Sequence, residues 1–129
     1  SCLTPVIQFS AAPWRILNAD QLRTVHAQLA VRRQWQEYLE QVLCECARTG
    51  APAVRYMEYE FPHQGMEQLL DQYMLGSRLV APVLEKGKTA REVYIPRGEW
   101  LWEGKLLHSR GEVLEFYAPD TFLIVLERQ

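Results

Sequence analysis

The sequence has 129 residues, of which 48% are apolar or aromatic and 23% are charged, with a formal net charge of −2. This length provides one domain or parts of two, and the apolar content argues against a disordered chain. Since there is no sustained run of lysine and arginine, we expect no nucleic-acid partner. The longest apolar run, residues 122–126, is far shorter than the ~20 residues of a membrane-spanning helix, so we expect no membrane span.

The spacing of cysteine and histidine argues against disulfides and metal sites. The three cysteines are an odd number, and Cys44 and Cys46 would point to nearly opposite faces of a helix. His26, His63 and His108 occur singly rather than at the spacing of metal ligands. We therefore expect a reducing, cytoplasmic location and no bound metal ion.

A long helix is predicted in the first half of the chain. Residues 18–48 contain neither glycine nor proline, and their apolar side chains recur at helical spacing. Asn18 is a suitable N-cap, Gln21 completes a capping box with it, and Gly50 marks the end. Such a helix would be about 45 Å long at ~1.5 Å per residue, so we expect a bend or break near residues 32–33.

After this helix the pattern changes to short β-type segments separated by turn residues. A spacing of about ten residues between strand centres favours an antiparallel sandwich or a small barrel. We expect a short helix at 65–71, and strands at 54–59, 79–84, 91–95, 99–102, 112–117 and 121–126.

Glu58 and Glu60 are the most suggestive pair of carboxylates. On one strand they would share a face, with Cα atoms about 6.6 Å apart. A retaining glycosidase needs its two carboxyl groups on opposite sides of the scissile bond, which neighbours on one strand cannot provide. We interpret the pair as solvated or salt-bridged.

Two tryptophans, Trp100 and Trp102, alternate along an expected strand and would point to the same face of it. Such a pair fits either a platform on which a sugar stacks or the inner face of a sandwich. Because no third aromatic residue clearly aligns with them, core packing is the favoured interpretation.

The order of segments resembles glycoside hydrolase family 31, which includes α-glucosidases, α-xylosidases, α-galactosidases and sulfoquinovosidases. The run DQYMLGSRLVAPVL at residues 71–84 is similar to the family's D-Q-F-L-L-G-x-x-L-L-V-A-P-V segment. Residues 49–55, followed by Phe61-Pro62, resemble its T-G-x-P-V-x-R-P-L…F-P strand. VYIPRGEW at residues 93–100 resembles its V-Y-L-P-x-G-x-W hairpin. The likeness covers essentially the whole chain.

This resemblance implies an α+β fold in two parts. Residues 1–62 would form a loop, the last long helix and the last strand of a (β/α)8 barrel. Residues 63–129 would form a short helix and the antiparallel β-sandwich that follows the barrel. The parent protein would be a retaining α-glycosidase that acts on carbohydrate through a glycosyl–aspartate intermediate, with no metal or organic cofactor. Because the family's two catalytic aspartates lie on earlier barrel strands, this fragment alone is expected to be inactive.

The resemblance also implies a contribution to the sugar site. Many members carry F-x-P-F-x-R-x-H in the loop after the seventh barrel strand, and its histidine binds the sugar. The matching residues 3–10 are LTPVIQFS, so Gln8 and Ser10 stand at the arginine and histidine positions. This departure indicates a subgroup version of the loop, in which Ser10, Trp14 and Arg15 line the sugar site. For Trp14 and Arg15, loop packing and an ion pair with the helix are an equal alternative.

A free-standing carbohydrate-binding or scaffold module is the alternative function. The two hypotheses differ in what covers the apolar face of the long helix. A free module must cover this face from within, whereas a barrel fragment leaves it exposed or buries it by self-association. We call this face the helix stripe; it consists of Leu22, Val25, Leu29, Trp35, Leu39, Val42, Leu43 and Cys46.

Overall fold

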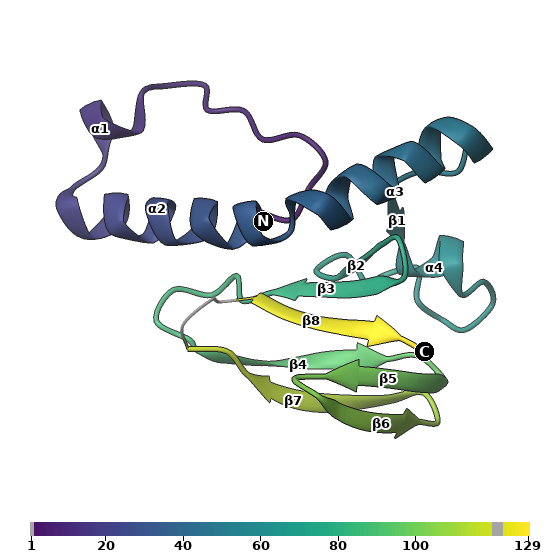
Figure 1. Ribbon diagram of the computed structural model, residues 1–129. Helices are drawn as coiled ribbons and strands as arrows, with labels where there is room; N and C mark the ends of the chain where they lie inside the picture. Colours follow the sequence, from purple (N-terminus) through teal and green to yellow (C-terminus); the bar gives the residue numbers. More distant parts are fainter. Residues whose placement is uncertain (1, 120–122) are drawn as a thin grey trace. The chain divides into compact units, whose positions relative to one another are not determined.

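The computed structural model describes residues 2–119 and 123–129. The chain divides into two compact units, residues 1–53 and residues 54–129, and each is described here by itself. The first unit is helical and begins with an extended N-terminal segment (Figure 1). Its helices are α1 (Pro13–Ile16), α2 (Ala19–Gln34) and α3 (Gln36–Thr49).

The predicted ends of the long helical region are confirmed. At the start of α2, the backbone N–H of Gln21 donates to the side chain of Asn18 at 2.9 Å. The N–H of Asn18 in turn donates to the side chain of Gln21 at 3.0 Å. This reciprocal pair is the capping box. At the end of α3, Gly50 adopts the left-handed conformation with φ of 76°, and its N–H donates to the carbonyl of Cys46.

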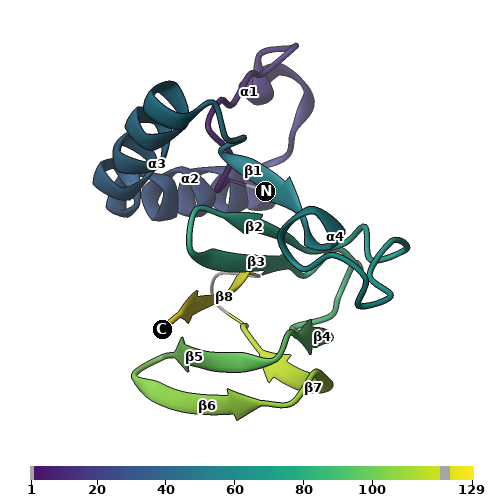
Figure 2. The same ribbon diagram turned by 90° about the vertical axis from the view of Figure 1, so that its right-hand side faces the viewer.

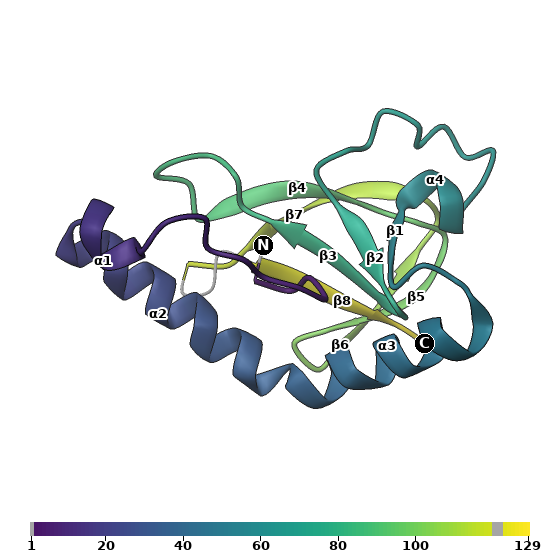
Figure 3. The same cartoon turned by 90° about the horizontal axis from the view of Figure 1, so that it is seen from above.

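The helical region is broken in two at Trp35, slightly beyond the expected position at residues 32–33. Trp35 has φ of −96° and ψ of 2°, outside the α-helical values. Its N–H is shared between the carbonyls of Val31, at 3.3 Å, and Arg32, at 3.1 Å, so the last turn of α2 is tightened. As a result α2 and α3 follow one another with a bend between them (Figure 3).

The second unit consists mainly of antiparallel β-structure, as expected. The larger sheet has the strand order β1-β2-β3-β8-β5-β6, which can be followed in Figure 2, and the smaller one pairs β4 with β7. Every adjacent pair of strands is antiparallel. The strands are β1 (Val54–Tyr56), β2 (Tyr73–Leu75), β3 (Arg78–Pro82), β4 (Ala90–Ile95), β5 (Gly98–Trp102), β6 (Lys105–Ser109), β7 (Glu112–Tyr117) and β8 (Leu123–Arg128). The first residues of the strand expected at 121–126 lie outside the described part of the chain.

The hydrophobic core of the second unit receives side chains from both sheets. Alternate residues of each strand contribute, as the period of two in a β-strand requires. Burying such side chains is the main source of stability of this unit. The buried cluster is formed by Met57, Phe61, Met66, Met74, Leu79, Ala81, Val93, Ile95, Trp100, Phe116, Ile124 and Leu126.

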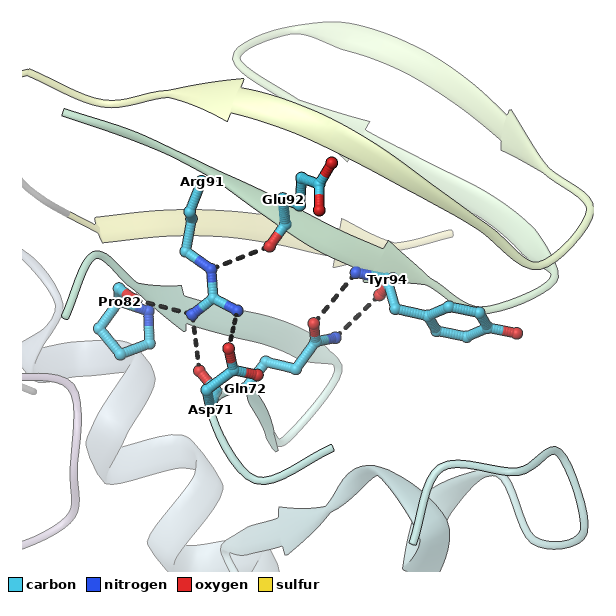
Figure 4. Close-up of polar contacts among 6 residues, drawn as sticks. All are labelled: Asp71, Gln72, Pro82, Arg91, Glu92 and Tyr94. Atoms are coloured by element: carbon cyan, nitrogen blue, oxygen red, sulfur yellow. Dashed lines mark hydrogen bonds and ion pairs between the residues drawn. The ribbon is translucent and has the colours of Figure 1, made fainter. Parts of the chain in front are cut away.

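Two polar side chains connect the smaller sheet to the larger one (Figure 4). The amide of Gln72, which is 1% exposed, donates to the carbonyl of Tyr94 at 2.8 Å and accepts from its N–H at 3.1 Å. The guanidinium group of Arg91 donates to the carbonyls of Asp71 and Pro82, both at 2.9 Å, and pairs with the Asp71 carboxylate. The segment before β2 is therefore fixed to β4.

Three expectations about this unit were wrong in detail. The strand expected at 54–59 ends at Tyr56, and the chain continues as the helical turn α4 (Met57–Glu60). A helical turn lets Met57 and Phe61, four residues apart, enter the core together. The helix expected at 65–71 is instead a loop with one turn, closed by a hydrogen bond from Leu69 N–H to the carbonyl of Met66.

The third difference is that β2 and β6 were not expected. Both belong to tight hairpins with two-residue turns, Gly76-Ser77 before β3 and Glu103-Gly104 before β6. Glu103 and Gly104 have φ of 46° and 76°, the positive values that such turns require. Glutamate is an unusual residue for this conformation, so the second hairpin carries only a weak turn signal at Glu103.

Candidate functional site

The N-terminal segment of the first unit is held to the end of α2 by one arginine. Arg32 donates hydrogen bonds to the backbone carbonyls of Cys2 at 2.9 Å, of Thr4, and of Pro5 at 2.8 Å. The Thr4 hydroxyl donates to the carbonyl of Val6, which closes a small local turn. A charged donor shared by three carbonyls fixes the path of this segment strongly.

The start of this segment is buried. Cys2 is 6% exposed and Leu3 is fully buried. Burial raises the pKa of the Cys2 thiol, and the opposing effects, from its backbone hydrogen bond and the charge of Arg32, are smaller. Because less thiolate forms at a given pH, Cys2 is not an activated nucleophile.

The middle of the segment has the opposite character, because large apolar side chains lie on the surface there. Val6, Phe9, Trp14 and Ile16 are each more than half exposed, with Val6 at 79% and Trp14 at 74%. Exposed apolar residues that follow one another along a loop are typical of a surface that contacts a ligand or another part of a protein.

The three residues predicted for the sugar site all lie in this exposed part. Ser10 lies in a bend, and Trp14 and Arg15 lie on the single turn of α1, whose first residue is Pro13. All three side chains are exposed. Within the described residues, none of the three makes a side-chain hydrogen bond or ion pair with the rest of the chain.

A groove lies beside the anchored end of the segment, and it does not include the predicted residues. Its volume is about 370 Å³, and it is lined by Pro5, by residues of α2 and α3, and by the anchoring Arg32. Ser10, Trp14 and Arg15 are absent from its lining. Sequence reasoning missed the role of Arg32, because its carbonyl partners are 27 to 30 residues away and leave no local pattern.

The carboxylates Glu58 and Glu60 lie in α4 rather than on a strand, and both are bound by the protein itself. Glu60 forms ion pairs with Arg55 at 3.0 Å and with Arg128 at 3.2 Å. Glu58 accepts hydrogen bonds from the backbone N–H of His63 at 2.8 Å and of Met66 at 3.3 Å. The salt-bridged interpretation is thus confirmed for Glu60, although the shared strand was wrong.

The two tryptophans of β5 are structural. Trp100 is fully buried and its Nε1–H donates to the carbonyl of Pro96 at 2.8 Å. Trp102 packs edge-on against Phe116, with ring centroids 4.9 Å apart. Core packing is confirmed, and the aromatic platform that a binding module would need is not exposed at this position.

The remaining acidic and metal-ligating side chains do not gather into a further site in the described part of the chain. Among residues 2–119 and 123–129, no group of three or more histidine, cysteine, aspartate or glutamate side chains is arranged to hold a metal ion. Of the aspartates in the sequence, Asp20 pairs with Arg23 and Asp71 pairs with Arg91, whereas Asp120 lies outside the described residues. None of the helices among the described residues combines the length and the apolar composition that a membrane span requires.

Comparison with known families identifies the second unit. The sequence model of the glycosyl hydrolase family 31 C-terminal domain matches residues 50–128, which is more than half of the chain. The chain belongs to glycosyl hydrolase family 31. The resemblance inferred from the motifs is thereby confirmed, and the antiparallel sheets of the second unit are the family's C-terminal β-domain.

Individual relatives in family 31 agree with this assignment. The chain is 34% identical over 120 residues to the mouse myogenesis-regulating glycosidase, covering 90% of this chain and 17% of that protein. It is 34% identical over 131 residues to a sulfoquinovosidase of Agrobacterium fabrum, covering 92% of this chain and 19% of that protein. The chain therefore spans less than one fifth of these relatives.

Solved structures of family 31 show the same fold. An α-xylosidase from a soil metagenome, complexed with xylose, matches with a TM-score of 0.72 and 31% identity. The match covers 94% of this chain and 18% of that one. A cycloalternan-forming enzyme from Listeria monocytogenes, in complex with a pentasaccharide substrate, matches with a TM-score of 0.75 and 30% identity, covering 91% and 12%.

Proposed function

We propose that this chain is the C-terminal portion of a retaining α-glycosidase that hydrolyses O-glycosyl bonds in carbohydrates. In this proposal residues 1–62, with α2, α3 and β1, come from the end of the catalytic barrel, and residues 63–129, which contain all the other strands, form the domain that follows it. The observation that carries the proposal is the family match over residues 50–128. The likeness to the α-xylosidase supports it further, because it covers 94% of the chain and so extends into the helical unit.

The proposal assigns the reactive carboxylates to a part of the parent protein outside these residues. A retaining mechanism requires a nucleophile and an acid/base that face each other across the scissile bond, about 5–5.5 Å apart. Asp20, Asp71 and Glu60 are each occupied by an arginine, and Glu58 binds two backbone amides. These pairings support an inactive fragment. The proposed mechanism uses only carboxyl groups and therefore needs neither a metal ion nor an organic cofactor.

Within this scheme, the exposed N-terminal segment lines the sugar site. Barrel enzymes place their active sites on the loops that follow the strands. We assign hydrogen bonding with sugar hydroxyls to Ser10 and Arg15, and an apolar contact with the sugar ring to Trp14. The exposure of these side chains and their lack of partners among the described residues support this role, and Arg32 would fix the segment that carries them.

Hydrolysis of an aryl α-glycoside tests the proposed function directly. The full-length protein should release the aryl group at a rate far above the uncatalysed reaction. The 129-residue chain, purified in the same way, should show no rate above background, because it lacks the reactive carboxylates. Turnover by the short chain, or no turnover by the full-length protein on a panel of α-glucosides, α-xylosides, α-galactosides and α-sulfoquinovosides, would contradict the proposal.

Two further proposals concern the cell and the assembly. A cytoplasmic location is proposed from the odd number of cysteines, and fractionation of cells that express the protein would test it.

The second proposal is that the short chain self-associates through the helix stripe. The part of the stripe on α2 supports it, because no residue of α2 is buried, whereas Leu39 and Val42 on α3 are buried. Light scattering of the 129-residue chain would show whether it forms dimers.

A further inference from the structure

A second pocket in the β-domain has the composition of an anion site. Its volume is about 440 Å³, and it is lined by Gln64, Tyr94, Arg97, Arg110 and Gly111. Arg97 and Arg110 lie on the two connections that join the sheets, from β4 to β5 and from β6 to β7. The register places these connections side by side, because Gly98 is paired with Ser109 on one side and Ile95 with Glu112 on the other.

The two arginines of this pocket have no acidic partner among the described residues. Neither Arg97 nor Arg110 makes a side-chain hydrogen bond or an ion pair within residues 2–119 and 123–129. No carboxylate lines the pocket. Glu99, which follows Arg97 closely in sequence, is 3.2 Å from His108 across the β5–β6 pair. In contrast, the ion-paired Arg91 is bound within the fold and is only 13% exposed.

The turns that carry the arginines are fixed by hydrogen bonds with buried side chains. The indole of Trp100 donates to the carbonyl of Pro96, next to Arg97, at 2.8 Å. The hydroxyl of Ser109 donates to the carbonyl of Ile95 at 2.7 Å and accepts from the N–H of Gly111 at 3.1 Å. Ser109 therefore links the β4–β5 connection to the β6–β7 connection by hydrogen bonds.

The other lining residues are held in the same manner. Gln72 binds both backbone groups of Tyr94, and the side chain of Tyr94 extends away from these bonds (Figure 4). Glu58 binds the backbone amides of His63 and Met66, on either side of Gln64. A Cβ at Gly111 would lie 2.9 Å from the Tyr94 hydroxyl, so glycine at this position leaves room for that hydroxyl beside the pocket.

We propose that this pocket binds a small oxyanion, namely a phosphate or carboxylate group, free or carried on a small molecule. Guanidinium groups present paired donors that match two oxygens of such an anion, and Gln64 and the Tyr94 hydroxyl supply further hydrogen bonds. Because the lining backbone is already fixed, little ordering is required on binding. The arginines are exposed, so the affinity is about millimolar and decreases with added salt. This proposal does not depend on the glycosidase activity.

Calorimetric titration of the full-length protein tests the site, with inorganic phosphate, glucose 6-phosphate and glucose as probes. The double variant Arg97→Gln/Arg110→Gln should weaken phosphate binding by about tenfold or more, since it removes two charge-assisted donors. Lys105→Gln, an exposed cation on β6 outside the pocket lining, is the control and should bind phosphate like the wild type. Arg97→Lys/Arg110→Lys keeps the charge and should give an intermediate affinity.

The probes distinguish the sources of the anion. Equal affinity for phosphate and glucose 6-phosphate supports a site for the free anion, and tighter binding of glucose 6-phosphate supports a sugar-borne one. In either case glucose, which carries no anion, should bind the wild type and the Arg97→Gln/Arg110→Gln variant equally. The proposal is overturned if phosphate does not bind the wild type at tens of millimolar. It is also overturned if folded single variants at Arg97 and Arg110, or the lysine double variant, bind phosphate as the wild type does.

Discussion

At the scale of single residues, Arg32 determines whether the N-terminal segment has a defined path. It binds three backbone carbonyls, whereas the side chain of its neighbour Arg33 makes no hydrogen bond or ion pair with the described residues. The composition of the helix does not predict this difference between Arg32 and Arg33, because both arginines occur at its basic end. Partners that are distant in sequence become visible only when the chain is folded.

Replacement of Arg32 by alanine should release the segment. Three carbonyls would lose a charged donor, and we expect the free energy of unfolding to fall by about 2 kcal/mol. Amide hydrogen exchange in residues 2–17 should accelerate, which mass spectrometry of peptides would detect. Arg33→Ala is the control. Equal exchange in the two variants would show that Arg32 does not anchor the segment.

A substitution of Trp14 is the simplest test of the proposed sugar site. In the full-length protein, Trp14→Ala should lower kcat/KM for an aryl α-glycoside by about tenfold to a hundredfold, through loss of contact with the sugar. The melting temperature should stay unchanged, because the side chain is 74% exposed. Val6→Ala, which removes an equally exposed apolar side chain from the same segment, should leave kinetics unchanged. If both variants reduce activity equally, the segment acts only by packing.

At the scale of elements, the sequence predicted best those features that depend on neighbouring residues. The capping box of Asn18 and Gln21 and the end of α3 at Gly50 follow from local hydrogen bonding, and both are confirmed. All six expected strands overlap observed ones for the same reason, since their alternation is local, although the first of them ends early at Tyr56. Features that depend on distant partners were missed: α4 is helical because its face enters the core, and β2 pairs with strands on both sides.

The helical turn α4 is fixed to two strands by Glu60, which pairs with Arg55 of β1 and Arg128 of β8. Glu60→Gln removes the charge and leaves the largely buried Arg55 without its counterion. We expect a loss of about 2 kcal/mol in the free energy of unfolding, measured by urea denaturation. Glu67→Gln, at an exposed residue whose side chain has no partner among the described residues, should have almost no effect. A stability unchanged by both variants would mean that α4 is held by its apolar contacts alone.

At the scale of the whole molecule, the sequence predicted the family more securely than the site. The motifs at residues 71–84 and 93–100 lie in the β-domain, where backbone turns and buried positions restrict the choice of residue. The candidate sugar-binding residues lie in an exposed segment with few contacts, where Gln8 and Ser10 depart from the family pattern. These residues could be named as candidates from the sequence, but their arrangement around a sugar could not be predicted, because the rest of a sugar site lies on other parts of a barrel.

The most direct test of the account is to trap the covalent intermediate of the full-length protein. A fluorinated α-glycosyl substrate, which forms the glycosyl–enzyme faster than water removes it, should add one sugar to the intact mass. Peptide mapping should place the label on an aspartate outside these 129 residues, and the isolated chain should remain unlabelled. Attachment of the sugar to a carboxylate within this chain, such as Glu58 or Asp71, would contradict the account.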